Sequence, residues 1–480
     1  MWSRDRTSGQ VVVAGQPHAA SQASPYVRNP TVMSTTTEPT EVGVHVVPRL
    51  PPELWLLIIR FATSAPIISP FEFAYYYEPF QSRNHKITTA LFDDALRDKC
   101  TIMTVCKQWY ALVGDTRYED IRIGRQIASL YPVLDGPAAP VGGEPGTGTT
   151  CIIAPHYARR AVLTVLPYAH DEEPTFHAPS AIALLALFPH LEVLVRPPFE
   201  SAPFLLPASP RQQRCLPTPT ITTPTVAPAL PSLRRLEWVF EDRDGRGHTS
   251  GLNLLYDILT AAPSLHELVL TGSMPRPPDQ NRVHLPALRT LRLLGGAGEC
   301  WYIAVQITLW ELPVLENVVV EGHGHAGPLR MLWEACKEQV RMLELALGGG
   351  RWGGVSLGDV SKIVAICPSL EVLNLQVGVE EYVNRTPMDV DDDTSSCTHN
   401  MLQRIGICID DLECSVETWM KIVNYTGKLV EGCPSLRQVL LYVSDVEVAS
   451  QHPRFHAFRE TLSSSGGQLF LHSVRRVRCS

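Results

Sequence analysis

A serine flanked by glycines in GVSLG (354–358) has the spacing of the G-x-S-x-G turn, in which a serine hydroxyl attacks a carbonyl carbon. Asp410 and His452 follow Ser356 in the chain order that the triad of such hydrolases requires. The turn also needs a strand leading into it, but the preceding residues are mostly glycine, which disfavours strands. Ser356 and Asp359 fit better as a capping box that opens a helix. We expect no catalytic residues, and we keep a hydrolase that uses Ser356 as an alternative.

A second stretch, GHGHAG (322–327), matches the G-x-G-x-x-G signature of dinucleotide-binding folds and follows the apolar segment ENVVV. Glu344 lies near the position where such folds carry a ribose-binding acid. The pattern occurs in a single copy, Pro328 follows it, and nothing else in the chain indicates a doubly wound sheet. We therefore interpret it as a turn between a strand and a helix, and we expect no cofactor.

Acidic residues at alternate positions, Asp389, Asp391 and Asp393, look like the start of an EF-hand calcium loop. The sixth position of that loop needs glycine and the twelfth needs glutamate, but Thr394 and Asn400 stand there. The sequence therefore predicts an acidic loop rather than a calcium site.

Two histidine pairs could each begin a metal site: His323 with His325, and His452 with His456. Neither pair has a third ligand at the spacing of a known site. We expect these histidines to lie at the surface or in loops, and we expect no bound metal.

The composition excludes several classes of protein. The chain has 480 residues, of which 45% are hydrophobic and 19% are charged, with a net charge of −8 and a pI of about 6.1. Because no basic surface is indicated, we expect no binding to nucleic acid or to a membrane. The 12 cysteines form no C-x-x-C pair, and no stretch reaches the ~18 consecutive apolar residues of a membrane span. Since no secretory leader is recognisable, we expect a cytoplasmic or nuclear protein.

Three stretches have the composition of unstructured segments. Residues 1–45 are rich in Ser, Thr, Pro, Gln and Ala, and predict a disordered tail. Residues 197–231 carry a proline every few positions and predict a long loop. Residues 384–398 include MDVDDDTSSC and predict an acidic loop.

Between these stretches a short pattern recurs, P-x-L-x-x-Φ-x-Φ, where Φ is an apolar residue. Proline-less copies are VRMLELAL (340–347) and MLQRIGICI (401–409). The copies with proline are FPHLEVLV (188–195), LPSLRRLEWVF (230–240), APSLHELVL (262–270), LPALRTLRLL (285–294), LPVLENVVV (312–320), CPSLEVLNL (367–375) and CPSLRQVLL (433–441).

Each copy predicts a short strand, because apolar residues at alternate positions place one face of a strand in a core. The leucines of LNLLYDILTAAP (252–263) have helical spacing and predict a helix before one such strand, ended by its proline. A helix and a strand cannot cover their own apolar faces, so such units must stack. The expected fold class is α/β, with a βα solenoid over residues 116–480.

The repeats resemble leucine-rich repeats over roughly residues 158–445, in degenerate form, since the Asn or Cys ladder of that family is missing. The resemblance implies a concave surface of parallel strands that binds a protein. The exposed positions of each strand, between the leucines, would line that surface, and they give our candidates for the substrate surface: Arg234, His266, Arg289, Glu371 and Arg437.

Ahead of the repeats, LPPELWLLIIRFATSAP (50–66) predicts a helix that is apolar on both sides. Pro51, Pro52 and Glu53 suit its first turn, where a missing N–H costs nothing and a negative charge is favourable. A second helix is predicted over residues 96–113. Two short helices cannot cover both faces of the first one, so the uncovered face needs a partner.

LPPELWLLII followed by VCKQWYAL resembles an F-box of the fungal F-box-like type, here over residues 46–115 with an inserted loop at 64–95. The resemblance implies docking onto the Skp-type adaptor of a cullin–RING ubiquitin ligase. The positions that match the adaptor-facing residues of that family are Leu50, Pro51, Leu54, Ile58, Val105, Cys106 and Trp109.

The chain would then be a non-catalytic substrate receptor of an SCF-type ubiquitin ligase, with a protein substrate on its repeats. Besides a hydrolase that uses Ser356, two alternatives stay open. The helices of residues 50–113 could serve only as a cap on the solenoid, or the chain could be a leucine-rich-repeat scaffold unconnected to ubiquitin.

Overall fold

The computed structural model divides the chain into two units, 1–50 and 51–480. In the first unit it describes Leu50 alone, so the predicted tail of 1–45 lies outside the described residues, as do most of the predicted loops at 197–231 and 384–398. The structure describes residues 50–63, 85–114, 119–123, 158–163, 182, 185–197, 229–240, 250–272, 282–294, 300–321, 326–347, 357–377, 399–409, 416–443, 446–464 and 466–473.

Three helices open the second unit. They are α1 (Pro52–Thr63), α2 (His85–Val105) and α3 (Lys107–Gly114). The prediction of a single helix over 96–113 is wrong, because Cys106 is not helical and separates α2 from α3. The inserted loop is also shorter than predicted, since α2 already begins at His85, beyond the last proline of that segment.

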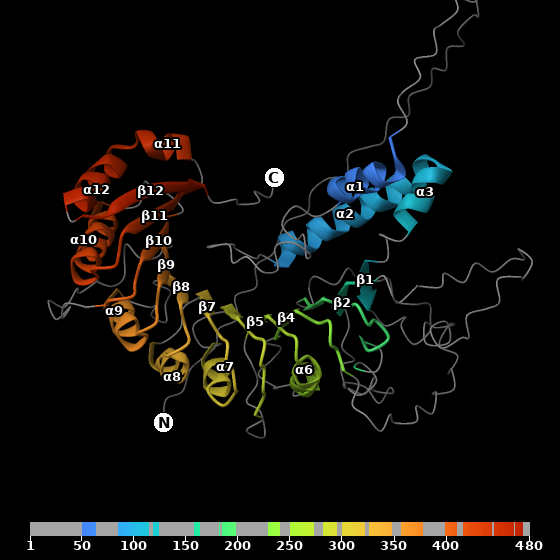
Figure 1. Ribbon diagram of the computed structural model, residues 1–480, viewed down its shortest axis with the longest axis horizontal. Coiled ribbons are helices and arrows are strands. Elements are labelled where there is room, and N and C mark those ends of the chain that lie inside the picture. Colours follow the sequence, from blue (N-terminus) through green and yellow to red (C-terminus); the bar gives the residue numbers. More distant parts are fainter. Residues whose placement is uncertain are drawn as a thin grey trace, which may run out of the picture. The chain divides into compact units, whose positions relative to one another are not determined.

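Twelve strands of the described residues form one parallel sheet whose spatial order equals their order in the chain. Helices α6 to α10 lie along one face of this sheet (Figure 1). The α/β class and the βα solenoid are therefore confirmed.

The strands are β1 (Asp120–Ile123), β2 (Arg160–Leu163), β3 (Val193–Arg196), β4 (Arg235–Val239), β5 (Glu267–Thr271), β6 (Thr290–Leu294), β7 (Asn317–Glu321), β8 (Met342–Leu347), β9 (Val372–Val377), β10 (Arg404–Ile409), β11 (Gln438–Val443) and β12 (Gln468–Ser473). The helices of the repeats are α6 (Ser250–Ala261), α7 (Cys300–Ile307), α8 (Ala326–Cys336), α9 (Leu357–Ile366), α10 (Val416–Gly432), α11 (Val446–Gln451) and α12 (Pro453–Ser464).

The leucines of the repeat build the core between sheet and helices. In β5, Leu268 and Leu270 are fully buried in this core, and the helical leucines and isoleucine of α6 pack in the same cluster. Each buried side chain of this size stabilises the fold by ~1.5–3 kcal/mol. One cluster runs through all the repeats, as expected for units that bury their apolar faces only by stacking.

The proline of each copy belongs to a β-turn rather than to the end of a helix. In the β5 copy, α6 ends at Ala261 and the N–H of Leu265 donates to the carbonyl of Ala262 at 3.2 Å, with Pro263 between them. Proline suits the second position of such a turn, because its ring fixes the required φ. Similar bonds close the turns before β4, β6, β7, β9 and β11.

Glycine is required at one strand end. Gly272, directly after β5, has φ +86°, and a Cβ at this position would lie 2.4 Å from the backbone oxygen of Phe240. Gly466 has nearly the same φ, +85°, but a Cβ there would meet no atom within 4 Å. A side chain at either glycine would strain the backbone, but only a side chain at Gly272 would also overlap another residue.

We expect Gly272→Ala to destabilise the protein by more than ~2 kcal/mol, because the left-handed backbone costs ~1–2 kcal/mol and the overlap with Phe240 adds to it. Gly466→Ala should lose only the backbone part. Urea unfolding of both variants, compared with the parent, measures the difference. Equal losses for the two variants would contradict the packing described for Gly272.

Candidate protein-interaction surfaces

One side of α1 packs inside the helical region. Ile59 is 2% exposed, and the indole of Trp55 packs against that of Trp109 in α3, with ring centroids 5.2 Å apart and ring planes tilted by 50°. Val113 of α3 is fully buried as well. These contacts account for the side of α1 that carries Trp55 and Ile59.

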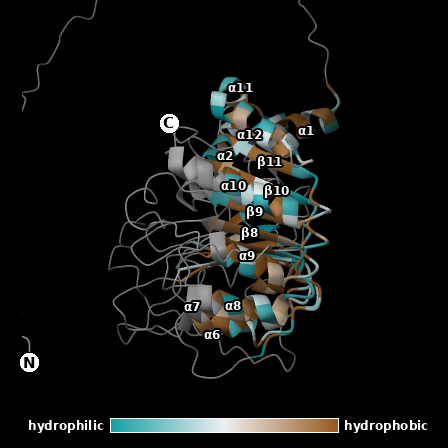
Figure 2. Cartoon of the chain, turned by 90° about the vertical axis from the view of Figure 1, so that its left-hand side faces the viewer, coloured by the Kyte–Doolittle hydropathy of each residue, from teal (hydrophilic) through white to brown (hydrophobic). Residues whose placement is uncertain are grey.

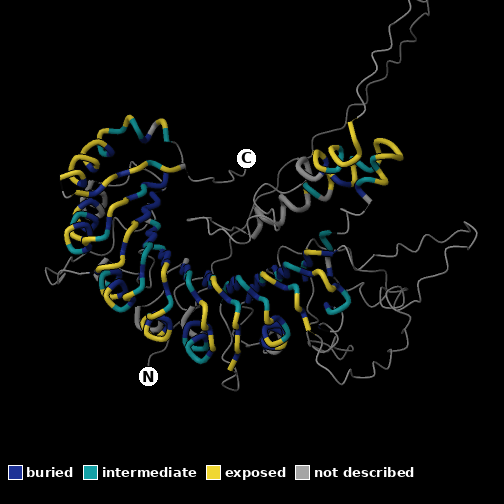
Figure 3. The backbone as a smooth tube through the Cα atoms, viewed as in Figure 1, coloured by how far each residue is buried: buried dark blue, intermediate teal, exposed yellow. Residues whose placement is uncertain are grey.

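The other side of α1 is open. Leu54, Leu57 and Ile58 lie at i, i+3 and i+4, and their exposed fractions are 45%, 65% and 45%. Figure 2 shows α1 as a largely hydrophobic helix, and Figure 3 shows exposed residues along it. We call Leu54, Leu57 and Ile58 the α1 face. Neighbouring apolar side chains at one helical face, exposed together, are typical of a protein-interaction site.

The other positions predicted to face an adaptor are mostly exposed too. Leu50, in the first unit, is 37% exposed, and Pro51 is exposed. Val105 is 59% exposed and Cys106 is exposed, and Tyr110, which we did not predict, is 52% exposed. The role of these residues in binding stays a prediction.

Trp109 makes a structural contact that the sequence did not reveal. Its ring is partly buried against Trp55, so it holds α1 and α3 together. Replacing Trp109 would disturb the helical region as well as any interface. The α1 face is thus the cleaner place to test binding.

Cys106 caps the helix that follows it. Its Sγ accepts a hydrogen bond from the backbone N–H of Trp109 at 3.4 Å, at the N-terminus of α3, where N–H groups lack partners within the helix. Helix α2 therefore ends just before Cys106 and α3 begins just after it, while the thiol of Cys106 stays exposed.

Cysteine thiols of the helical region should react faster than those in the core of the repeats. Cys100 and Cys106 are exposed, whereas burial raises the pKa of Cys336 to about 11. Burial, with Cys336 and Glu334 nearby, raises the pKa of Cys367 to about 12. At pH 8 we expect iodoacetamide to label Cys100 and Cys106 in the native protein and to label Cys336 and Cys367 only after unfolding. Peptide mass spectrometry reads this out, and native labelling of Cys367 would contradict the buried core.

Helix α2 also contacts the first strand of the sheet. The ammonium group of Lys99, 6% exposed, lies 3.3 Å from Oδ2 of Asp120 in β1 and 4.0 Å from Oε2 of Glu119. Such a contact is what a helical cap on the solenoid would make. It involves α2 and leaves the α1 face uncovered.

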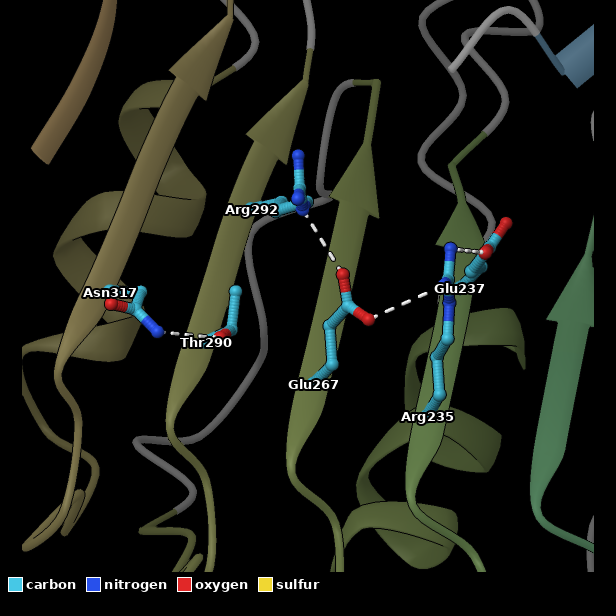
Figure 4. A network of polar contacts seen from close by, with 6 residues as sticks. All are labelled: Arg235, Glu237, Glu267, Thr290, Arg292 and Asn317. Carbon is cyan, nitrogen blue, oxygen red and sulfur yellow. Dashed lines mark hydrogen bonds and ion pairs between the residues drawn. The ribbon is translucent and has the colours of Figure 1, made fainter. Parts of the chain in front are cut away.

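Charged side chains that the sequence did not single out lie on the strand face turned away from the helices. Arg235 pairs with Glu237 within β4 and with Glu267 of β5 at 3.4 Å, and Arg292 of β6 donates from Nε to Glu267 at 3.0 Å (Figure 4). Glu267 and Arg292 are 6% and 2% exposed. Burial alone would lower the pKa of Arg235, but Glu237 and Glu267 outweigh it and raise that pKa.

The same face continues as polar side chains on the next strands. Asn317 of β7 donates from Nδ2 to the hydroxyl of Thr290 at 3.1 Å (Figure 4). Glu344 of β8 and Asn374 of β9 are each 1% exposed. The alternation of the repeat could have indicated this set, because these residues stand between the apolar ones.

The five predicted substrate-surface residues lie elsewhere. Arg234, His266, Arg289, Glu371 and Arg437 each stand one residue before a strand, in a row along the edge where the strands begin. The carbonyl of each row residue accepts from the next repeat, as in the bonds from the N–H of His266 and of Glu267 to Arg234. They are exposed or half-buried. Their predicted position within the strands was wrong, because each strand begins one residue later, at the second residue after the leucine.

Most of the residues that suggested chemistry lie outside the part of the chain that the structure describes. Ser356, the GHGH part of 322–327, and Asp389, Asp391 and Asp393 lie outside the described residues. His452 stands before α12, and its Nδ1 accepts from the N–H of Arg454 at 3.2 Å, which is a helix cap. Among the described residues no group of three His, Cys, Asp or Glu could hold a metal. None of their helices is long and apolar enough to span a membrane.

Comparisons with known proteins leave the family open. No protein-family model and no curated protein matches the chain. The crystal structure of a TLR13–ssRNA13 complex is similar to it at 14% sequence identity and a TM-score of 0.29, covering 66% of this chain and 36% of that one. The chain thus spans about a third of that protein's length. The fold assignment rests on the sheet itself.

Proposed function

We propose that the chain is a non-catalytic substrate receptor of an SCF-type cullin–RING ubiquitin ligase. Its helices would bind a Skp-type adaptor, and its repeats would hold a protein substrate close to the ligase. The reaction would be accelerated by proximity alone, since the receptor needs no reacting group of its own. A cytoplasmic or nuclear location goes with this role.

The observation that supports the proposal is the exposed α1 face. Leu54, Leu57 and Ile58 are about half exposed or more, while Ile59 on the opposite side is 2% exposed. A helix that is apolar on both sides and covered on one side only is typically completed by a partner. The resemblance of residues 50–113 to an F-box indicates that this partner is a Skp-type adaptor.

A second candidate is a repeat scaffold in which the helices cap the solenoid. The ion pairs of Lys99 with Glu119 and Asp120 favour it, because they tie α2 to β1. This candidate gives the α1 face no role, so the two differ in what they predict for that face.

Co-expression tests the proposal directly. The tagged full chain should retain a Skp-type adaptor through affinity purification and gel filtration at a ratio near one to one. A receptor that purifies folded but without adaptor would overturn the proposal and favour the scaffold. The unrelated surface of α8, with Met331 52% exposed, offers a control site for substitutions.

A further inference from the structure

The sheet loses its acidic residues towards its last strands. Strands β1, β4, β5, β7 and β8 each contain Asp or Glu. Strands β9 to β12, with the sequences VLNLQV, RIGICI, QVLLYV and QLFLHS, contain neither. An arginine on β10, β11 or β12 therefore has no acidic residue on its own strand or on a neighbouring one.

Arg404 is such an arginine. The strand pairing aligns it with Arg235 and Glu267, so it belongs to the strand face turned away from the helices. On that face Arg235 and Arg292 both pair with Glu267 (Figure 4). Arg404 pairs with no carboxylate of the described residues, and its side chain is exposed. Its cation is thus available to an acid from outside the chain.

The guanidinium of Arg404 is held in place by a neutral neighbour. Its Nε donates to the amide oxygen of Gln438 on β11 at 3.3 Å. The two terminal nitrogens of the guanidinium are left for a carboxylate, which they can bind through two parallel hydrogen bonds. Because the amide oxygen of Gln438 is already used, its Nε2 can donate to the same carboxylate.

Apolar side chains lie next to Arg404 on the same face. Leu440 of β11 is half-buried, and Phe470 of β12, which is aligned with it, is 42% exposed. Val269 and Val319, at the same register on β5 and β7, are fully buried. The apolar surface of this face is therefore open at its last strands, and exposed apolar groups beside polar ones are typical of a protein-interaction site.

We call Arg404, Gln438, Leu440 and Phe470 the β10–β12 face. Leu440 is aligned with Gly406, which stands two residues after Arg404. Arg404 and Leu440 are therefore ~6.6 Å apart along the strands and ~4.8 Å apart across them. In an extended peptide, side chains two residues apart point to the same side at a spacing of ~6.8 Å. Such a peptide can reach the cation with one side chain and the apolar pair with the next but one.

We propose that the β10–β12 face binds an extended acidic segment of a protein partner, with an Asp or Glu carboxylate on Arg404 and an aliphatic or aromatic side chain on Leu440 and Phe470. Charge complementarity selects this occupant, because the face carries an arginine and its strands carry no acid. The inference rests on the proposed function in so far as the repeats hold a protein. It adds which strands hold that protein and which chemistry they recognise.

A peptide pool tests the proposal. The immobilised full chain is incubated with acetylated and amidated nonapeptides whose five central positions are randomised, and retained peptides are identified by mass spectrometry. We expect enrichment of peptides in which Asp or Glu stands two residues from Leu, Ile, Met, Phe, Tyr or Trp. The best peptide is then made with a fluorophore at its N-terminus, and its affinity is measured by fluorescence anisotropy.

Reversing the charge of Arg404 should reverse the preference of the face. Arg404→Glu should lower the affinity for the best peptide at least ~10-fold, and should raise the affinity for a version with Lys in place of the acid. The matched control is Arg289→Glu, which reverses an exposed arginine directly before β6. This position lies four strands away, ~19 Å, where salt screens the charge, so the affinity should change less than ~2-fold.

Removing the exposed ring should weaken binding as well. Phe470→Ser should lower the affinity at least ~5-fold, because the peptide side chain loses its apolar contact. Met331→Ser on α8 removes an apolar side chain that is 52% exposed and should leave the affinity unchanged. Thermal unfolding of each variant verifies that these exposed substitutions leave the fold intact.

Three results would overturn the proposal: a pool without enriched acidic peptides, equal effects of Arg404→Glu and Arg289→Glu, or a dimer in light scattering that Phe470→Ser abolishes. In the last case a second copy of the chain would be the occupant. Adaptor binding is measured separately at the α1 face. A chain that binds acidic peptides but no adaptor would support the β10–β12 face and exclude the ligase role, and the reverse result would exclude this face alone.

Discussion

Leu54→Asp combined with Ile58→Asp should abolish adaptor binding while the protein stays folded. Both side chains are 45% exposed, so each charge can remain in water in the free protein. In a complex the pair would lose the burial of two large apolar side chains, ~1.5–3 kcal/mol each at full burial. We therefore expect the affinity to fall by more than ~100-fold. Titration calorimetry with purified Skp-type adaptor measures the change.

The matched control is Met331→Asp, because Met331 is an apolar helical residue with a similar exposed fraction of 52% on α8. It should leave the affinity unchanged. An unchanged affinity of the Leu54/Ile58 variant, with normal folding, would exclude the α1 face as the adaptor site.

Glu267→Ala should be the most damaging single change on the strand face. Glu267 is 6% exposed and contacts both Arg235 and Arg292, and its removal leaves two buried guanidinium groups without this carboxylate. Breaking a buried ion pair from one side typically costs ~3–5 kcal/mol. We expect a loss of that size in the free energy of unfolding, measured with urea.

Glu371→Ala is the control for this prediction. Glu371 pairs with Arg341 at 3.5 Å, but the Arg341 side chain is 61% exposed, so solvent screens the pair. The expected loss is below ~1 kcal/mol. Similar small losses for both variants would mean that the Glu267 cluster is not buried as described.

The fold could be predicted well where the repeat carries its full pattern. Strands β3 to β11 match copies recognised in the sequence, since the alternating apolar residues, joined in seven of the nine copies by a turn proline, point to the same structure. Strands β1, β2 and β12 were missed because Tyr118, Ala158 and Gly466 stand where the recognised copies carry Leu or Val two residues before the strand. In the β3 copy the last Φ position is Arg196, whose guanidinium lies 4.7 Å from the ring centroid of Trp238.

The candidate sites were harder to predict than the fold. An apolar helix such as α1 must bury its faces, but its sequence does not show which face the rest of the chain covers; in the structure that face carries Ile59. The roles of Trp109 and of the pair Glu267 and Arg292 depend on contacts between separate elements, which periodicity does not encode. The five predicted substrate-surface residues lie one residue before the strands rather than within them, because hydrogen bonds to the next repeat decide where each strand begins.

Cys106 provides the most direct measurement of whether the helices bind a Skp-type adaptor. Its thiol is exposed in the free protein and follows Val105, which is 59% exposed. The rate of native iodoacetamide labelling at this residue is measured by mass spectrometry with and without purified adaptor. The ligase proposal predicts that saturating adaptor slows labelling of Cys106 at least ~10-fold, as expected for a thiol that becomes covered. An unchanged rate at an adaptor concentration that saturates the chain in calorimetry, or the lack of any binding, would contradict it.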